Sequence, residues 1–587
     1  MESTGWKDYY ERSQSNSDGI KKRLRKEKKM RKSKKIVSLL LASLMATSMF
    51  AGCSSDNNVD DVNESNASQE EKEITPEEYY GVADWESQEN VIDDNYRNYY
   101  QIFVYSFADS DGDGIGDING ITEKLDYLAE LGYNGIWLSP IHQSTTYHKY
   151  DVVDYYSIDK EYGTMEDFEN FIAECNKRGI KVVIDFIFNH TSAKHEWFTT
   201  ATKYLRGLEA GEEPDLNECP YVGYYNFVKS SEASGSAYYK VTNSEYSYEG
   251  QFWDQMPDLN LANEALRTEI ETIAQFWIDK GVGGFRLDAA KEFYTGNIQK
   301  NVEVLKWFTD YVKSVDEDLY LVAEVWDNHA TITSYYTSGI TSIFDYCYGD
   351  SSGYIMKALN SGTSTTNGKS LAERFVTTQN DYLEANPDMI NAPFIANHDC
   401  GRIAGFAQRK IEKMKIAAAL SLYMSGSSFT YYGDEIGMVG AGIDENKRAP
   451  MYWSDFAGAE GICTGPAAME DFSQEFGSVE SQMKDTYSLY WYYRNLLHIK
   501  NVYPEIARGL VEAVEVEDGR VCAIKKTYEG ETIYLLFNLA NEETVVTLSK
   551  DKYSYEGLVA ALEVDENKVK MEGETVTLPA YGVAVIK

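Results

Sequence analysis

Short apolar runs alternate with helix-like segments through most of this chain, and this alternation restricts the fold more than any other feature. Eight runs are almost continuously apolar, as expected of strands that are buried on both faces. They cover residues 99–105, 135–138, 181–186, 283–288, 319–325, 342–346, 393–398 and 429–434. Helical periodicity fills most of the intervals, as at residues 121–131 and 165–178, each followed by a glycine. Eight such units predict an α/β fold, a closed (β/α)8 TIM barrel, and an open doubly wound sheet is the alternative.

Two regions depart from this alternation and predict additional domains. The interval between the third and fourth runs, residues 189–282, is much longer than a connection of this kind requires. Its polar, Tyr-rich part predicts an inserted domain at residues 191–250. Near residue 500 the pattern changes to alternating strands with turn signals. The sequence therefore predicts a barrel over residues 93–500 and a C-terminal antiparallel β-sandwich over residues 501–587.

The N-terminal 53 residues read as an export signal rather than as part of the fold. Residues 30–53 combine a basic head, an apolar stretch of about fifteen residues and small residues before Cys53, which is the layout of a secretory signal. The ending Phe50-Ala51-Gly52-Cys53 resembles a bacterial lipobox with lipidation at Cys53; an uncleaved anchor helix is the alternative. Residues 54–92 are rich in Ser, Asn, Asp and Glu and predict a flexible acidic linker. We therefore expect a lipid-anchored protein on the extracellular face of a bacterial cell membrane.

The charge and composition exclude several classes of protein and partner. The chain carries a net charge of −39 although residues 1–53 hold 13 Lys/Arg against 5 Asp/Glu, so the remainder is more acidic still. An acidic body repels phosphate backbones, and no nucleic-acid partner is expected. With 25% charged and 43% hydrophobic residues, the chain is neither collagen-like nor a polytopic membrane protein. The six cysteines after Cys53 show no CxxC pair and predict free thiols.

Charged side chains stand at the carboxyl ends of the predicted strands, where barrel enzymes place their functional residues. Arg286 and Asp288 end the fourth run, and Glu324 ends the fifth. His398 and Asp399 end the seventh. The third run adds Asp185, Asn189 and His190. Three carboxylates, at 288, 324 and 399, would converge on one face of the barrel, which is more than a structural ion pair requires.

The positions of Asp288 and Glu324 suit one reaction in particular. Neighbouring strands lie about 4.8 Å apart, and retaining glycosidases hold their two carboxyl groups about 5–5.5 Å apart, against about 6.5–9.5 Å in inverting ones. Arg286 projects from the same face as Asp288 and is expected to keep it ionised and nucleophilic. Apolar neighbours are expected to raise the pKa of Glu324, as a general acid requires.

Five segments of the chain follow one another in a specific order. They are residues 185–190 (DFIFNH), 256–260 (MPDLN), 284–292 (GFRLDAAKE), 324–327 (EVWD) and 394–399 (FIANHD). Together they resemble the motifs of the α-amylase family, glycoside hydrolase family 13. The resemblance covers residues 95–587 and implies an inserted domain B within the barrel. It also implies Asp288 as nucleophile, Glu324 as acid/base and Asp399 as the carboxylate that binds the hydroxyls of the −1 sugar.

The same resemblance implies a sugar subsite and a mechanism. His190, Arg286 and His398 would line the −1 subsite. Residues 147–150 (YHKY) resemble the family's His-x-Tyr element, in which Tyr150 stacks on the sugar ring and His148 bonds a hydroxyl. The implied reaction is a double displacement through a glycosyl-enzyme ester, with retention of the α configuration.

An acidic, Gly-rich loop predicts a bound cation. Residues 109–117 read DSDGDGIGD, and Asp109, Asp111, Asp113, the Ile115 carbonyl and Asp117 match positions 1, 3, 5, 7 and 9 of an EF-hand-like loop. Residue 120 is Gly where an EF-hand has Glu, so the loop is not an EF-hand. Four like charges this close need a cation, and the segment resembles the calcium loop after the first barrel strand of many family members. A structural calcium ion is therefore expected.

Two further segments indicate which substrate the protein prefers. The MPDLN segment resembles the group intermediate between oligo-1,6-glucosidases and neopullulanases, and Ala289-Ala290 favours α-1,4 bonds. We expect a monomeric α-amylase that acts on starch and malto-oligosaccharides. The alternatives are an oligo-1,6-glucosidase, a neopullulanase or a glucanotransferase, and, from another class, a non-catalytic glucan-binding lipoprotein. The presence of all three carboxylates favours an enzyme.

Overall fold

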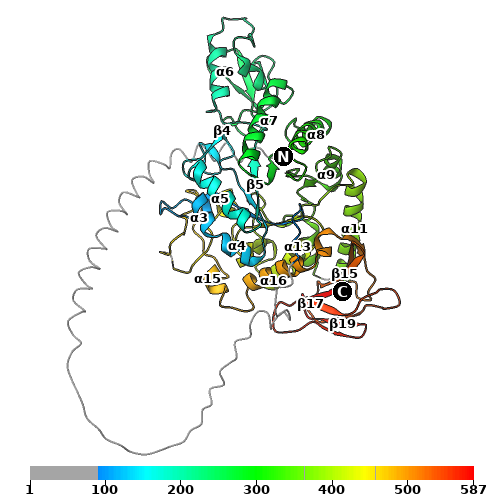
Figure 1. Cartoon of the computed structure of the whole chain (residues 1–587). Coiled ribbons are helices and arrows are strands. Elements are labelled where there is room, and N and C mark those ends of the chain that lie inside the picture. Colours follow the sequence, from blue (N-terminus) through cyan, green and yellow to red (C-terminus); the bar gives the residue numbers. More distant parts are fainter. Residues whose placement is uncertain (1–89, 363, 457) are drawn as a thin grey trace, which may run out of the picture. The chain divides into compact units, whose positions relative to one another are not determined.

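The computed structural model describes residues 90–362, 364–456 and 458–587 (Figure 1). The predicted signal with Cys53 and almost all of the predicted linker lie outside the described residues. Within the part that the structure describes, no helix is both long enough and apolar enough to cross a membrane. The six cysteines in the described ranges are free, as predicted.

One parallel sheet forms the wall of the barrel, with the strand order β11-β10-β9-β5-β2-β1-β12. The strands are β1 Asn98–Ile102, β2 Gly135–Leu138, β5 Lys181–Phe186, β9 Gly284–Leu287, β10 Tyr320–Ala323, β11 Ser342–Ile343 and β12 Ser428–Tyr431. Each coincides with a predicted run. Gly284 opens β9 because strand β10 comes very close there: a Cβ at this position would lie 1.9 Å from the Tyr320 carbonyl oxygen. The first and last strands of this sheet in chain order, β1 and β12, pair in parallel, which rules out the open sheet.

The seventh predicted run, residues 393–398, forms no regular strand, and here the prediction was wrong. Residues 392 and 393 nevertheless accept backbone hydrogen bonds from both neighbouring segments of the barrel wall. Asp345 N–H donates to the Ala392 carbonyl (3.0 Å) and Phe429 N–H donates to the Pro393 carbonyl (2.9 Å). Pro393 itself has no N–H to donate, and so the ladder is interrupted. These single bonds fill the gap between β11 and β12 and confirm a closed barrel.

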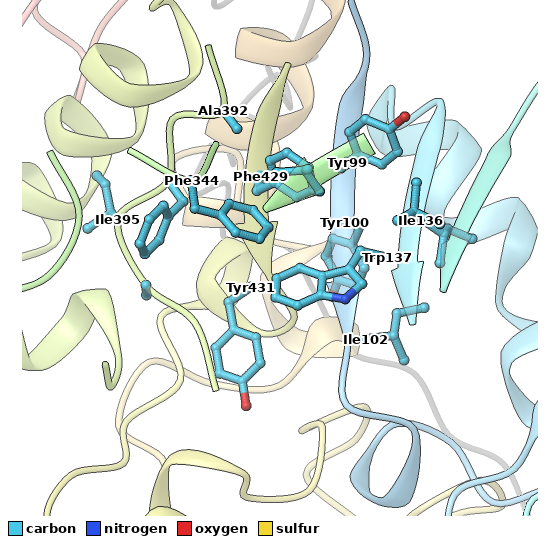
Figure 2. Packing of buried hydrophobic residues seen from close by; sticks show 14 of the residues in the cluster. Tyr99, Tyr100, Ile102, Ile136, Trp137, Phe344, Ala392, Ile395, Phe429 and Tyr431 are labelled. Carbon is cyan, nitrogen blue, oxygen red and sulfur yellow. The ribbon is translucent and has the colours of Figure 1, made fainter. Parts of the chain in front are cut away.

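Aromatic side chains fill the interior of the barrel, as Figure 2 shows. Trp137 packs on Phe344 with ring centroids 5.0 Å apart, and Phe344 packs edge-on against Phe429 at 4.8 Å. Tyr99 stacks on the other side of this group, 4.7 Å from Phe429. Burying such large apolar surfaces is the main stabilising contribution of the interior. The rings also form the floor on which the polar strand-end residues rest.

Amphipathic helices cover the outside of the barrel (Figure 1). The second predicted helix is α5, Met165–Lys177, which begins with a capping box between Thr164 and Asp167. The first splits into α3, Ile118–Glu123, and α4, Leu125–Leu131, because Lys124 leaves helical geometry. The other covering helices are α7 Glu264–Asp279, α8 Ile298–Val315, α9 His329–Tyr336, α10 Tyr354–Asn360, α11 Asn367–Ala385, α13 Ile411–Leu422 and α16 Leu489–Val502.

The long interval after β5 folds into a small unit of its own. It contains α6, Glu196–Gly207, and a three-stranded antiparallel sheet in the order β6-β8-β7. Its strands are β6 Phe227–Lys229, β7 Tyr238–Lys240 and β8 Tyr246–Glu249. A separate apolar cluster that includes Leu205, Val222 and Tyr246 holds it together. Before it, β3 His142–Ser144 and β4 Val152–Ile158 form a hairpin.

The C-terminal part is an antiparallel β domain of two sheets, as predicted. One sheet has the order β13-β14-β15-β20-β17 and the other β16-β19-β18. The strands are β13 Leu510–Ala513, β14 Val521–Tyr528, β15 Glu531–Asn538, β16 Thr544–Thr547, β17 Leu558–Leu562, β18 Lys570–Glu572, β19 Thr575–Leu578 and β20 Val583–Ile586. One apolar cluster joins the two sheets. Helix α16 continues past residue 500, so the first strand of this domain begins later than residue 501.

A buried lysine connects the C-terminal sheet to the barrel. The Lys526 side chain on β14 is fully buried and donates from Nζ to the carbonyl oxygens of Tyr423 (2.6 Å) and Ile506 (2.5 Å). Both acceptors belong to segments that precede the C-terminal domain. Its terminal amino group therefore satisfies backbone acceptors that the apolar contact between the domains would otherwise leave unbonded.

Candidate active site

Parallel strand pairing places Asp288 and Glu324 side by side. Asp288 directly follows β9 and Glu324 directly follows β10, and these strands pair with Leu287 opposite Ala323. Glu324 N–H donates to the Leu287 carbonyl at 3.0 Å, which extends the pairing by one residue. Both carboxylates therefore leave the same edge of the barrel from neighbouring strands, as the sequence predicts.

One buried guanidinium links three carboxylates at this edge. Arg286 Nη1 lies 2.5 Å from Asp185 Oδ1 and 2.6 Å from Asp288 Oδ1, and Nη2 pairs with Glu324 Oε2. Its side chain is 1% exposed and lies 5.3 Å above the ring of Trp137. Trp137 Nε1 donates to Asp185 Oδ2 at 3.3 Å. The Trp137 ring thus restrains the guanidinium of Arg286, and the guanidinium in turn positions the three carboxylates.

The two central carboxyl groups bind protons more tightly than free ones. Burial raises the pKa of Glu324 to about 6, and Arg286 opposes this rise while Asp288 adds to it. The raised pKa agrees with the expectation for a proton donor. Burial also raises the pKa of Asp288, with Arg286 again opposing. The sequence predicts that Arg286 keeps Asp288 ionised; the guanidinium does favour the ionised form, but desolvation has the larger effect on this pKa.

Asp399 sits in a different electrostatic environment. His398 Nε2 lies 3.0 Å from its Oδ2, and Arg448 Nη2 lies 3.0 Å from its Oδ1. Burial would raise the pKa of Asp399, but His398 and the guanidinium of Arg448 outweigh it and hold this pKa well below the ordinary value. Asp399 is consequently still an anion near pH 6, where Glu324 begins to carry a proton.

Tyr150 connects the two groups of charged residues. Its hydroxyl lies 2.6 Å from His398 Nε2 and 3.2 Å from Asp185 Oδ2. His148 stands beside it and accepts a hydrogen bond from Tyr150 N–H at Nδ1 (3.1 Å). Asp151 fixes this loop, because its carboxylate accepts from Ser144, Thr145, Thr146 and Ser192.

His190 lies farther out, where the barrel meets the inserted unit. It is buried, forms an isolated bridge with Asp258, and its ring centroid lies 5.3 Å from that of Phe252. Phe252 is 46% exposed. The structure thus places His190 at the junction with the insertion, whereas Arg286, His398 and Tyr150 stand within hydrogen-bonding reach of the carboxylates.

Two residues of the site, Asp185 and Arg448, had no predicted role. Asp185 was visible at a strand end, but only the structure gives it a place, between Arg286 and Tyr150. Arg448 donates from Nη1 to the hydroxyl of Tyr147 at 2.8 Å in addition to pairing with Asp399. Arg448 lies in a loop after β12, where neither periodicity nor a strand end identifies it.

The acidic loop gathers three of its four aspartates. Carboxylate oxygens of Asp109, Asp111 and Asp117 lie within 4.8 Å of one another. Asp113 is not in this group: its Oδ1 accepts from Ile115 N–H at 2.8 Å. A second loop supports the first, since Asp109 N–H donates to the Gly461 carbonyl (3.2 Å) and Thr464 N–H to the Gly114 carbonyl (2.8 Å). Clustered carboxylate oxygens are the donor set that calcium prefers.

The fold and the charged cluster together define a class of protein. A carboxyl group whose pKa is raised to about 6, beside a second carboxyl group at the carboxyl end of a (β/α)8 barrel, is the arrangement of a glycoside hydrolase.

Comparisons with known proteins identify the family. Residues 101–509 match the alpha amylase catalytic domain, and residues 511–585 match the maltogenic amylase C-terminal domain. The chain belongs to the α-amylase family of glycoside hydrolases and is an enzyme. It is 36% identical to alpha-amylase 3 of Dictyoglomus thermophilum over 84% of this chain and 93% of the relative. It is 32% identical to glucan 1,6-alpha-glucosidase of Streptococcus pneumoniae, over 80% and 96%. The solved structure of Eubacterium rectale Amy13B superposes with a TM-score of 0.82, at 43% identity, over 85% of this chain and 96% of that one.

Proposed function

We propose that this protein is an α-amylase that hydrolyses α-1,4 bonds of starch and malto-oligosaccharides with retention of configuration. The observation that carries the proposal is the placement of Asp288 and Glu324 on neighbouring, in-register strands with Arg286 bonded to both. Inverting enzymes need room for a water molecule between their two carboxyl groups. Neighbouring strands lie about 4.8 Å apart, which is close to the separation of about 5–5.5 Å in retaining enzymes.

The mechanism assigns a separate step to each carboxyl group. Glu324, which the raised pKa keeps protonated in weak acid, donates its proton to the glycosidic oxygen. Asp288 attacks the anomeric carbon, the C–O bond to the leaving sugar breaks, and a glycosyl ester forms. Glu324, now a carboxylate, takes a proton from water, which cleaves the ester and restores both groups. Asp288 must be ionised for the attack, and Arg286 supplies the charge that favours this form.

The remaining residues hold the sugar. Asp399 is anionic and 28% exposed, which suits a carboxylate that accepts bonds from sugar hydroxyls as positive charge grows at the anomeric carbon. Tyr150 offers its ring to the apolar face of a pyranose. His148, His190 and His398 supply ring nitrogens around it, and burial lowers the pKa of all three. Neutral imidazoles bond hydroxyls without opposing the developing positive charge.

The bond preference rests on the sequence and on the relatives. One relative is called an alpha-amylase, while others are called glucan 1,6-alpha-glucosidase and oligo-1,6-glucosidase. Ala289-Ala290, with the higher identity to the amylase, supports α-1,4 bonds. An oligo-1,6-glucosidase is the second candidate. Product chromatography on starch, pullulan and isomaltose separates them: malto-oligosaccharides from starch support the proposal, and glucose from isomaltose alone overturns it.

A matched pair of variants tests the catalytic assignment. Asp288→Asn should abolish the release of reducing ends from starch, because an amide cannot form the glycosyl ester. Asp310→Asn, on the exposed side of α8 where the carboxylate pairs with Lys306, should keep full activity. A fully active Asp288→Asn enzyme would contradict the assignment.

We also propose a structural calcium ion and a membrane anchor. Asp109, Asp111 and Asp117 would hold the ion, which would neutralise their charges and stabilise the loop against residues 461–464. The signal-like residues 30–53 support export and lipidation at Cys53. Mass spectrometry of the mature N-terminus tests the anchor, and an unprocessed chain without lipid overturns it.

A further inference from the structure

A hollow on the outer wall of the barrel is separate from the charged cluster. It measures about 440 Å³ and is lined by α7, α8 and β4. Its eight lining residues are Tyr156, Thr268, Glu271, Thr272, Gln275, Phe276, Asp279 and Tyr311. None of them belongs to the strand-end cluster. Small-molecule sites in proteins commonly measure about 300–1,000 Å³, so this hollow has room for a ligand of several rings.

The register of helix α7 creates the floor of the hollow. Positions 268, 271, 272, 275, 276 and 279 follow the three- and four-residue spacing of one helical face. The opposite face of α7, with Leu266, Ile270 and Trp277, is buried against the barrel. On the lining face Phe276 is only partly buried: its ring packs against the edge of the core and also lines the hollow.

Aromatic side chains are held in position around the hollow. Tyr156 is 38% exposed, and its hydroxyl donates to Glu269 Oε1 at 3.0 Å. Tyr311 donates from its hydroxyl to the Glu271 carbonyl at 2.8 Å. Phe276 packs edge-on against Tyr156, with centroids 5.2 Å apart. Anchored hydroxyl groups restrict the motion of both tyrosine rings, and this lowers the entropy lost when a ligand binds to them.

The polar groups of the lining select for an uncharged ligand. They are two threonines, one glutamine and two carboxylates, and the lining contains no lysine, arginine or histidine. The cation beside it, Lys280, lies 5.5 Å from the Phe276 ring centroid and is already paired with Glu169. Both carboxylates already accept hydrogen bonds, Glu271 from Trp307 and Asp279 from Gln275. Fixed aromatic rings with hydroxyl, amide and carboxylate groups around them match the apolar C–H faces and the hydroxyls of a neutral sugar chain.

From this geometry we propose that the hollow between α7, α8 and β4 is a second binding site for a neutral oligosaccharide. Its ligand class, an α-glucan, rests on the proposed function of the catalytic cluster. A polymer bound on the outer wall stays near the enzyme between cleavage events. The site therefore acts on long substrates and leaves short ones unaffected.

Stoichiometry tests the site in the full-length protein. Titration calorimetry of the inactive Asp288→Asn protein with maltoheptaose should show two sites per chain. Adding Thr272→Arg, which fills the hollow from an exposed helix position without touching the core, should leave one site. Tyr156→Ala should weaken the second site about fivefold or more, while Tyr528→Ala, a partly exposed tyrosine on β14, should change nothing. One site in every protein would overturn the proposal.

Kinetics separates this proposal from the proposed function. With active enzyme, Thr272→Arg should raise KM for soluble starch about threefold or more and leave kcat/KM for maltotetraose unchanged. An equal loss on both substrates would contradict a remote site. If the unsubstituted enzyme releases no reducing ends from either substrate, the proposed function fails, but the count of maltoheptaose sites still decides the binding proposal.

Discussion

Replacing the central guanidinium is the sharpest test of the active-site electrostatics. Arg286 touches Asp185, Asp288 and Glu324 and lowers the pKa of each. An opposite charge this close lowers a carboxyl pKa by about 1 to 3. In Arg286→Gln we therefore expect the pKa of Asp288 and of Glu324 to rise by that amount.

The pH profile of kcat/KM measures this change. The acidic limb reports ionisation of Asp288 and the basic limb reports loss of the proton from Glu324, whose pKa is about 6 in the intact enzyme. Both limbs should move to higher pH, by about 1 to 3 pH units. The maximum should fall at least about a hundredfold, because a positioned donor is lost.

Two controls make the result interpretable. Arg286→Lys keeps the charge but not the two-armed geometry, so its limbs should move less than those of Arg286→Gln. Lys306→Gln, an exposed ion-pair position on α8, should leave the profile unchanged. If Arg286→Gln lowers the rate while both limbs stay in place, the guanidinium acts only as a spacer and the electrostatic reasoning is refuted.

Three further predictions concern the acid, the cation and a buried carboxyl group. Glu324→Gln should reduce kcat on starch about 10²- to 10⁴-fold, because it removes the proton donor. It should reduce the cleavage of an aryl glycoside much less, because a good leaving group needs no proton. Equal losses on both substrates would contradict the acid role. After removal of bound metal with a chelator, adding 1 mM calcium should raise the Tm of the unsubstituted protein, and Asp111→Asn should abolish this rise. If calcium does not change the Tm of the unsubstituted protein, the calcium site is contradicted. Burial raises the pKa of Asp258 to about 8, so the folded state holds a proton that the unfolded chain loses near pH 4, and stability falls as pH rises from about 4 to 8. Asp258→Asn should flatten this decline in the urea midpoint, and an unchanged slope would refute the raised pKa.

The barrel could be predicted from the sequence because its strands are buried on both faces. That burial imposes continuous apolar runs, and strands β2 and β5 begin and end where those runs do. The run at residues 393–398 looked equally apolar, yet its pairing reduces to single backbone bonds around Pro393. Hydrophobicity identified a segment inside the wall but not whether its hydrogen bonds form a regular ladder.

Most residues of the active site could be predicted from the ends of the strands, because parallel pairing brings the ends of adjacent strands together. Arg448 could not be found in this way because its loop is set by tertiary contacts with Tyr147 and Asp399. The raised pKa of Glu324 was predicted from its apolar neighbours, but that of Asp288 was not. The pKa of Asp288 depends on how far desolvation exceeds the attraction of Arg286, and only the packing of the interior determines that difference.

The lysine at position 526 limits how this enzyme can be shortened or recombined. A catalytic fragment that stops before β14 would keep the Tyr423 and Ile506 carbonyls but lose the Lys526 amino group that donates to both. A C-terminal module grafted from another enzyme would need a long side chain with a terminal amino donor at the same strand position. Modular exchange at this junction therefore depends on one buried lysine as well as on the loop that connects the two parts.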